Sequence, residues 1–187
     1  NSGIQLEFQG LNFKSPLHGD YNLTNIAASI AFGVIFKVKL INIQNAIAEY
    51  QSENNRSQKL KIDNVEYVLD AYNANPSSME AALKAFAENK SNSKTVILGD
   101  MLELGIYSKE EHENALKLCL EYKFNNIFTI GNHFNTTSVE AKEIIKFERI
   151  EVFKKYLKKQ NILFDFVLIK GSRALELEGL IPFLKSK

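Results

Sequence analysis

The amino-acid sequence predicts an α/β fold in which a mostly parallel sheet carries helices on both faces. From about residue 54 onward, short runs rich in β-branched and aromatic residues alternate with longer segments of helical periodicity. Such alternation is typical of parallel strands joined by helices. The expected strands, each followed by a helical pattern, lie at 65–69, 95–98, 126–130, near 148–153 and at 166–169.

The helices of this second part are recognised by apolar residues spaced three and four apart. One is expected from about Ser77, and another is expected to open with a capping box formed by Ser108 and Glu111. Cys119 falls in an apolar stripe, so we expect a small buried side chain there rather than a reactive thiol. The residues expected to face inward are Met79, Ala82, Leu83 and Phe86; Ala115, Leu118, Cys119 and Tyr122; and Leu177, Leu180, Ile181 and Leu184.

A different pattern occupies residues 1–53, so we expect a domain boundary between 53 and 54. This first part contains a strand pair at about 5–13, followed by two amphipathic helices. Their expected apolar faces are Ile26, Ala27, Ile30, Ala31 and Val34 on the first helix, and Ile43, Ala46, Ile47 and Tyr50 on the second.

Composition restricts the possible partners. The 187 residues include 23 basic and 22 acidic side chains, for a net charge of +1, which predicts no general attraction to nucleic acid or to an anionic membrane. No apolar run reaches the ~18 residues that a membrane span needs. A single cysteine excludes an internal disulfide and is compatible with a reducing compartment. We expect a cytoplasmic monomer.

Polar turns follow several of the expected strands. They contain Asp70, Gly99 with Asp100, Gly131 with Asn132, and residues 170–173. Because ligands bind beyond the carboxyl ends of parallel strands, we expect a site at this edge of the sheet. Turn formation and helix capping explain Gly131 and Asn132 better. The dense polar cluster around Asp70, and the one at 170–173, favour a ligand.

The side chains at this edge indicate the kind of ligand. Arg56, folded back by strands at 59–62 and 65–69, offers planar recognition of an anion, and the carboxylate of Asp70 can accept from ribose hydroxyls. Ser172 and Arg173 supply a hydroxyl and a guanidinium suited to a carboxylate. Asn22 and Asn25 share a helix face, where their amides suit the edge of adenine or cap the helix equally well.

Longer motifs in this sequence resemble the C-terminal half of the Mur ligase family, in its D-alanyl-D-alanine-adding branch. The resemblance covers nearly the whole chain, and motifs in the family's order are more specific than any one alone. They are Gly19–Ala28, Asn55–Gln58, Asp70–Met79, Leu98–Gly105 and Lys170–Arg173. Where the family motif often has His before the Asn, this chain has Tyr21.

The resemblance implies roles for individual residues. Arg56 would contact a phosphate of ATP, Asp70 would hold the ribose, and Asn22 and Asn25 would face adenine. A second set, which would face the incoming dipeptide or the acyl centre, or orient that part of the site, is Asn73, Asn75, Asp100, Lys170, Ser172 and Arg173. Helix capping explains Asp100 nearly as well.

The implied reaction is ATP-dependent amide-bond formation. ATP with Mg²⁺ would phosphorylate the peptide carboxylate of UDP-MurNAc-tripeptide, and the amine of D-alanyl-D-alanine would attack the acyl phosphate. No Gly-x-x-x-x-Gly-Lys-Ser/Thr phosphate loop occurs in the sequence. We therefore expect a fragment in which residues 1–53 are the end of a central ATP-binding domain and 54–187 form a Rossmann-like C-terminal domain.

This interpretation places the catalytic lysine and the metal-binding acid upstream of Asn1. His18, His112 and His133 lack the spacing of metal ligands, so we expect surface or packing roles and no metal site in this chain. Two alternatives remain open. Another ligase of the superfamily, such as a folylpolyglutamate synthetase or a different Mur enzyme, would share Arg56 and Asp70. A non-catalytic nucleotide- or peptide-binding module is the other.

Overall fold

A computed structural model describes residues 3–17, 21–50, 55–91, 93–160 and 162–186. The chain forms two compact units, residues 1–53 and 54–187. Their boundary falls where the sequence pattern changes. That the first unit is the end of an ATP-binding domain stays a prediction.

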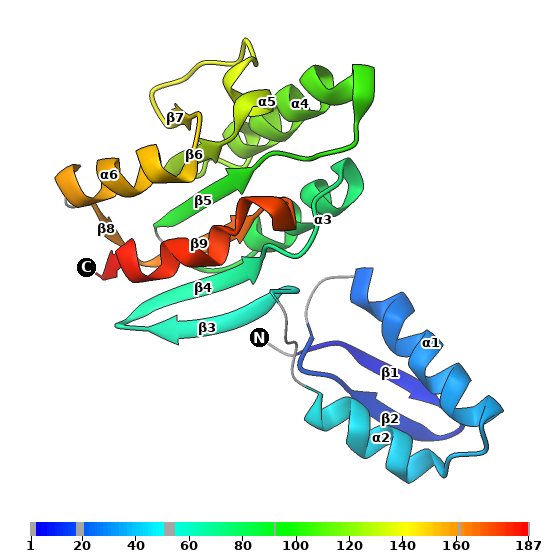
Figure 1. Cartoon of the computed structure of the whole chain (residues 1–187). Coiled ribbons are helices and arrows are strands. Elements are labelled where there is room, and N and C mark those ends of the chain that lie inside the picture. The colour runs from blue at the N-terminus through cyan, green and yellow to red at the C-terminus, as the bar shows by residue number, and fades with distance from the viewer. Residues whose placement is uncertain (1–2, 18–20, 51–54, 92, 161, 187) are drawn as a thin grey trace. The chain divides into compact units, whose positions relative to one another are not determined.

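The first unit is a small layer of two strands and two helices (Figure 1). Strands β1 (Gln5–Phe8) and β2 (Leu11–Lys14) form an antiparallel hairpin, and helices α1 (Tyr21–Ile35) and α2 (Leu40–Glu49) follow. The buried core contains Phe13, Ile26, Ile30, Ile43 and Ile47.

Helix α1 is apolar on more than the face that contacts this core. Of the predicted apolar face, Ile26 and Ile30 are buried, but Ala27, Ala31 and Val34 are exposed. Of the face predicted for the second helix, Ala46 on α2 and Tyr50 just after it are exposed as well. The exposed large apolar side chains on and just after α1 are Leu23, Phe32, Val34, Ile35, Phe36 and Val38. A helix that is apolar all round is normally covered on all sides.

The second unit contains a six-stranded sheet with the order β3-β4-β9-β5-β6-β7. Strand β3 (Gln58–Ile62) is antiparallel to β4 (Val65–Asp70), and the other pairs are parallel. The remaining strands are β5 (Lys94–Gly99), β6 (Asn126–Ile130), β7 (Ile144–Phe147) and β9 (Phe166–Lys170). The predicted mostly parallel α/β fold is confirmed.

Helices cover both faces of this sheet (Figure 1). On one face, α3 (Pro76–Ala87) and α4 (Ser108–Glu121) pack on strand residues such as Val96 and Leu98. On the other, α6 (Ile150–Gln160) and the 3-10 helix η3 (Leu177–Phe183) pack on Ile97 and Val167. Neighbouring residues of one strand thus enter different cores, as the two-residue period of a strand requires. Cys119, on the inward face of α4, is fully buried, as predicted, and burial raises the pKa of its thiol.

Short elements complete the unit. The 3-10 helices η1 (Gly105–Tyr107) and η2 (Arg173–Leu175) follow β5 and β9, and the four-residue helix α5 (Asn132–Asn135) follows β6. Strands β8 (Leu163–Phe164) and β10 (Lys185–Ser186) form a separate parallel pair.

Three local predictions were wrong. The strand expected near 148–153 is β7 at 144–147, and residues from Ile150 are helical. Ser108 does not cap α4, because Tyr107 precedes the helix in helical conformation and has no side-chain cap. The last segment, expected as an ordinary helix from Leu177, is a 3-10 helix that contains Pro182.

Candidate functional site

The parallel strands of the second unit deliver polar turns to one edge of the sheet, as predicted. Strands β4 and β9 end side by side, with Asp70 in register with Lys170. On the other side of β9, Lys170 is in register with Leu98, which directly precedes Gly99 and Asp100. The turns at 70–75, 99–101 and 170–173 therefore lie next to one another at the carboxyl edge.

Asp70 is held by donors from two directions. The ammonium Nζ of Lys170 lies 2.5 Å from Oδ2 of Asp70, and the backbone N–H of Ser57 donates to Oδ1 at 2.9 Å. The Lys170 side chain is 1% exposed and that of Asp70 is 17% exposed. Lys170 also donates to the carbonyl oxygen of Asn73 at 3.2 Å. The Asp70 carboxylate is thus held in place at the end of β4, and the Lys170 side chain is more deeply buried than that of Asp70.

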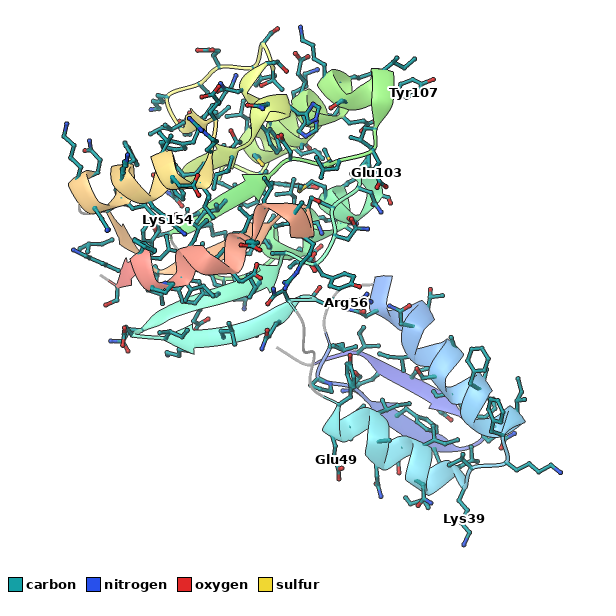
Figure 2. All side chains as sticks on the ribbon, viewed as in Figure 1. Lys39, Glu49, Arg56, Glu103, Tyr107 and Lys154 are labelled. Atoms are coloured by element: carbon teal, nitrogen blue, oxygen red, sulfur yellow. The ribbon has the colours of Figure 1, made fainter. Side chains whose placement is uncertain are left out.

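Arg56 lies in the turn just before β3, beside the carboxyl end of β4 (Figure 2). Its guanidinium carbon is 3.9 Å from the centroid of the Tyr72 ring, a cation–π contact, and both side chains are exposed. Asn55 and Ser57 on either side of Arg56 have positive φ angles of 60° and 46°. This turn presents Arg56 outward and the Ser57 amide to Asp70. The contact with Tyr72 orients the guanidinium, whose in-plane donors suit the recognition of an anion.

The turn after β4 carries the two asparagines assigned to the dipeptide. Oδ1 of Asn73 accepts from the Ala74 amide at 2.8 Å. Asn75 is the N-cap of α3, in a reciprocal capping box with Ser78. Both side chains are exposed. Asn75 therefore has a structural role, through its Oδ1, in addition to any contact with a ligand.

Asp100 is buried in a cluster behind the edge. Its carboxylate oxygens accept from the amides of His133 and Phe134, each at 3.0 Å, at the start of α5. Gly131 has a φ of 130°, and a Cβ there would lie 2.2 Å from the Asp100 carboxyl group. Asp100 thus connects β5 to α5. Its assignment to the substrate stays a prediction, and the geometry favours the capping alternative.

His112 completes this buried cluster. Its Nε2 accepts from the Met101 amide at 3.0 Å, its Nδ1 lies 2.6 Å from the Ser108 carbonyl oxygen, and its side chain is fully buried. These contacts describe a neutral ring with its proton on Nδ1. Burial lowers the pKa of His112, against the opposing effects of the Ser108 carbonyl and of Asp100. His112 is a packing histidine, as expected, whereas His18 lies outside the described residues.

The turn after β9 packs closely against the end of β5. A Cβ at Gly171 would lie 2.8 Å from the Cα of Gly99, so the space beside Gly171 is taken by the neighbouring strand end. The amide of Ser172 donates to the carbonyl of Asp100 at 3.2 Å. The guanidinium of Arg173 lies 2.8 Å from the carboxylate of Glu178, and the Arg173 side chain is about half exposed.

Asn22 and Asn25 lie in the first unit, near the start of α1. The Asn25 amide donates to Oδ1 of Asn22 at 3.2 Å, so the two side chains share a face as predicted. Asn22 is buried and Asn25 is exposed. The side chain of Tyr21 lies outside the described residues.

Sequence reasoning missed three participants of the second unit, namely the Ser57 amide, the Tyr72 ring as a support for Arg56, and the ion pair of Lys170. The ion pair of Lys170 could be predicted only from the register of Asp70 with Lys170, and this register exists because β9 lies beside β4. Within the described residues there is no group of three or more His, Cys, Asp or Glu that could hold a metal ion. The same residues contain no helix long and apolar enough to cross a membrane.

Comparison with known proteins places these features in a family. Residues 55–173 match the family described as "Mur ligase, glutamate ligase domain". The UDP-N-acetylmuramoyl-tripeptide–D-alanyl-D-alanine ligase of Treponema pallidum is 32% identical over 191 residues, covering 99% of this chain and 41% of its own length.

Solved structures agree. A crystal structure of MurF from Acinetobacter baumannii superposes with a TM-score of 0.83 at 25% identity, covering 95% of this chain and 41% of that one. MurF from Thermotoga maritima, in complex with ADP, has the same fold, with a TM-score of 0.75 at 22% identity over 97% of this chain and 45% of that one. The chain spans about two fifths of the length of the relatives it matches. It belongs to the Mur ligase family.

Proposed function

We propose that this chain is the C-terminal part of an ATP-dependent ligase that joins D-alanyl-D-alanine to UDP-MurNAc-tripeptide. The observation that carries the proposal is a relative of that name, similar over 99% of this chain. The paired turns at Asp70 and Lys170, at the carboxyl edge of a parallel sheet, support it because this edge is where such folds bind ligands.

In this proposal, Arg56 and Asp70 contact the nucleotide. The exposed guanidinium of Arg56 neutralises phosphate charge, and the fixed carboxylate of Asp70 accepts from ribose hydroxyls. Asn22 and Asn25 contact adenine from the first unit. The two amides are already aligned with each other, which suits the alternating donors and acceptors of a base edge.

The amine substrate is assigned to the turns after β4 and β9. Asn73, Asn75 and Ser172 offer amide and hydroxyl groups, and Arg173 offers a guanidinium for the carboxylate of D-alanyl-D-alanine. Because Arg173 is paired with Glu178 and half exposed, it must exchange or share this partner when the dipeptide binds. Holding the carboxylate would orient the amine for attack on the acyl phosphate.

Magnesium would neutralise the phosphates during acyl phosphate formation. The described residues form no acidic cluster that would hold it, so we assign no residue of this chain to the metal. We place the protein in the cytoplasm as a monomer, where nucleotide-linked substrates are available.

The full-length protein that contains this chain tests the proposal. We expect phosphate release from ATP that requires both UDP-MurNAc-tripeptide and D-alanyl-D-alanine, with the pentapeptide product identified by mass spectrometry. Product formation with glutamate instead of the dipeptide would favour a folylpolyglutamate-type or other Mur reaction. Binding of ATP or peptide without turnover would favour a non-catalytic module.

A further inference from the structure

Lys170 is the most deeply buried charged side chain at the carboxyl edge of the sheet. Its side chain is 1% exposed, and its ammonium contacts Oδ2 of Asp70 and the carbonyl oxygen of Asn73. Asp70 ends β4 and Asn73 lies in the turn that follows it, whereas Lys170 ends β9. A single ammonium therefore connects two strand ends that both carry residues of the proposed site.

Burial and geometry argue against a direct contact between Lys170 and substrate. A lysine has three donors, and here two of them are directed at protein acceptors. Removing an ammonium from water costs free energy that only close partners offset, so the contact with the Asp70 carboxylate compensates for the burial of Lys170. Lys170 was expected to face the substrate, but its surroundings are protein atoms.

The effect of Lys170 is seen in Asp70. One oxygen of the Asp70 carboxylate receives the Lys170 ammonium and the other receives the Ser57 amide, so neither oxygen can rotate away without losing a hydrogen bond. Oδ1 also accepts from the Ser57 hydroxyl at 3.4 Å. Because each carboxylate oxygen has two acceptor sites, Oδ2 keeps acceptor capacity beside the Lys170 ammonium, and a ribose hydroxyl could donate there.

We propose that Lys170 is a positioning residue that fixes the Asp70 carboxylate for the nucleotide and the Asn73 carbonyl on the amine-substrate side. The identity of the ligand rests on the proposed function, whereas the ion pair between Lys170 and Asp70 is observed in the structure. The two cations of the 170–173 turn then have different roles. Lys170 is buried and acts through Asp70, whereas Arg173 is exposed to solvent and is assigned to the dipeptide.

A double-mutant cycle in the full-length ligase tests the role. Lys170→Met should raise the KM for ATP about tenfold or more and change the KM for D-alanyl-D-alanine much less, because a charge-assisted contact to Asp70 is lost. In an Asp70→Asn background, Lys170→Met should have little further effect on ATP, since the group through which it acts is already altered. Effects that add, or a selective rise in the dipeptide KM, would overturn the proposal.

Lys146→Met is the matched control. Lys146 lies in β7 of the same sheet, is 13% exposed and donates to the carbonyl of Thr137 at 2.8 Å, away from the edge turns. Its loss should leave both KM values unchanged. If Lys170→Met does not fold, Lys170→Gln, which keeps a donor without the charge, replaces it in the double-mutant cycle. The KM for ATP should again rise more than the KM for D-alanyl-D-alanine.

A second measurement on the 187-residue chain is independent of ligase activity. Nitrogen-15 NMR of the lysine ammonium groups should show that Lys170 exchanges its protons with water at least about tenfold more slowly than exposed lysines. The signal is assigned by its loss in Lys170→Met, and Asp70→Asn should speed the exchange. Exchange as fast as that of exposed lysines would refute the ion pair. A full-length protein without ligase activity would instead refute the proposed function and leave this result standing.

Discussion

The carboxylate of Asp100 lies 3.6 Å from Nε2 of His112, with both side chains almost fully buried. Nε2 nevertheless accepts a hydrogen bond from the Met101 amide, so the ring is neutral beside a carboxylate. The Asp100 charge is instead directed to the amides of His133 and Phe134. This arrangement makes the cluster sensitive to protonation.

We expect the stability of the chain to fall as pH drops below about 6.5. Burial lowers the pKa of His112 from its ordinary value of 6.5, so the unfolded state binds more protons than the folded state just below that pH. The contribution of the neutral ring is fully present above pH 6.5 and is lost as pH falls towards the lower folded-state pKa.

Urea unfolding between about pH 7.5 and pH 5.5 measures this slope, which for one proton is at most about 1.4 kcal/mol per pH unit. His112→Gln should flatten the dependence. His133→Gln removes the neighbouring exposed ring, which packs against His112, and should retain most of the slope. An unchanged slope in His112→Gln would assign the pH dependence to other groups.

Asp100→Ala should destabilise the chain by about 3 kcal/mol, because two amides lose a charged acceptor. The loss should appear in urea unfolding. Glu113→Ala is the matched control, since Glu113 accepts the Ser138 amide in a hydrogen bond exposed to solvent and its removal should matter little. If a folded Asp100→Asn variant of the full-length ligase showed a selective rise in the KM for D-alanyl-D-alanine, the result would favour the predicted substrate contact of Asp100 over its capping role.

Arg56→Ala should weaken the use of ATP in the full-length ligase. Losing a charge-assisted contact to phosphate costs on the order of 1.5–3 kcal/mol, roughly ten- to over a hundredfold in kcat/KM for ATP. Arg56→Lys should recover part of the loss, because it keeps the charge without the planar stacking on Tyr72. Lys61→Ala is the control, because Lys61 is an exposed cation on β3, the strand that follows Arg56. Unchanged kinetics for ATP in Arg56→Ala would leave Arg56 a surface residue.

Arg173→Ala should raise the KM for D-alanyl-D-alanine strongly and leave that for ATP nearly unchanged, because a carboxylate loses its guanidinium. Glu178→Gln separates the two partners of Arg173. It frees the guanidinium and should preserve or lower the dipeptide KM. If Arg173→Ala and Glu178→Gln have the same effect, the surface ion pair between them is what matters.

The 187-residue chain alone should neither hydrolyse ATP nor form the pentapeptide. Its sequence lacks a phosphate loop, whose backbone amides and lysine bind the triphosphate in nucleotide-hydrolysing folds. A coupled assay for ADP release, at a chain concentration far above that used for the full-length enzyme, would reveal residual activity. Robust turnover would contradict the assignment of triphosphate binding to another part of the protein.

The sequence predicted the elements of the sheet because strand and helix periods differ clearly in residues 65–130. It failed where two patterns overlap. Ile150, Phe153 and Leu157 have helical spacing, and Phe153 and Leu157 are buried in α6, but the β-branched residues Ile150 and Val152 suggested a strand. Capping was misassigned for a similar reason, since Ser108 with Glu111 has the spacing of a capping box, whereas the box that forms uses Asn75 and Ser78.

The site was predictable in its location and less so in its contacts. The carboxyl edge of the sheet could be located from the sequence, because polar residues directly follow the apolar runs that form the strands. The partners of Asp70 and Arg173 depend on which strands are neighbours and on turn conformations, such as the positive φ of Ser57 and Glu176. These are set by the whole fold and leave no local signal in the sequence.

Strand β9 lies between β4 and β5, although it is the last of the six strands to be synthesised. Strands β4 and β5 do not pair with each other, so they stay separate on the ribosome until residues 166–170 emerge. Cotranslational folding can therefore assemble β5, β6 and β7 early, but the Asp70 turn is completed only when Lys170 arrives. A ribosome stalled before β9 should carry a nascent chain whose β4 hairpin remains open to proteases and chaperones.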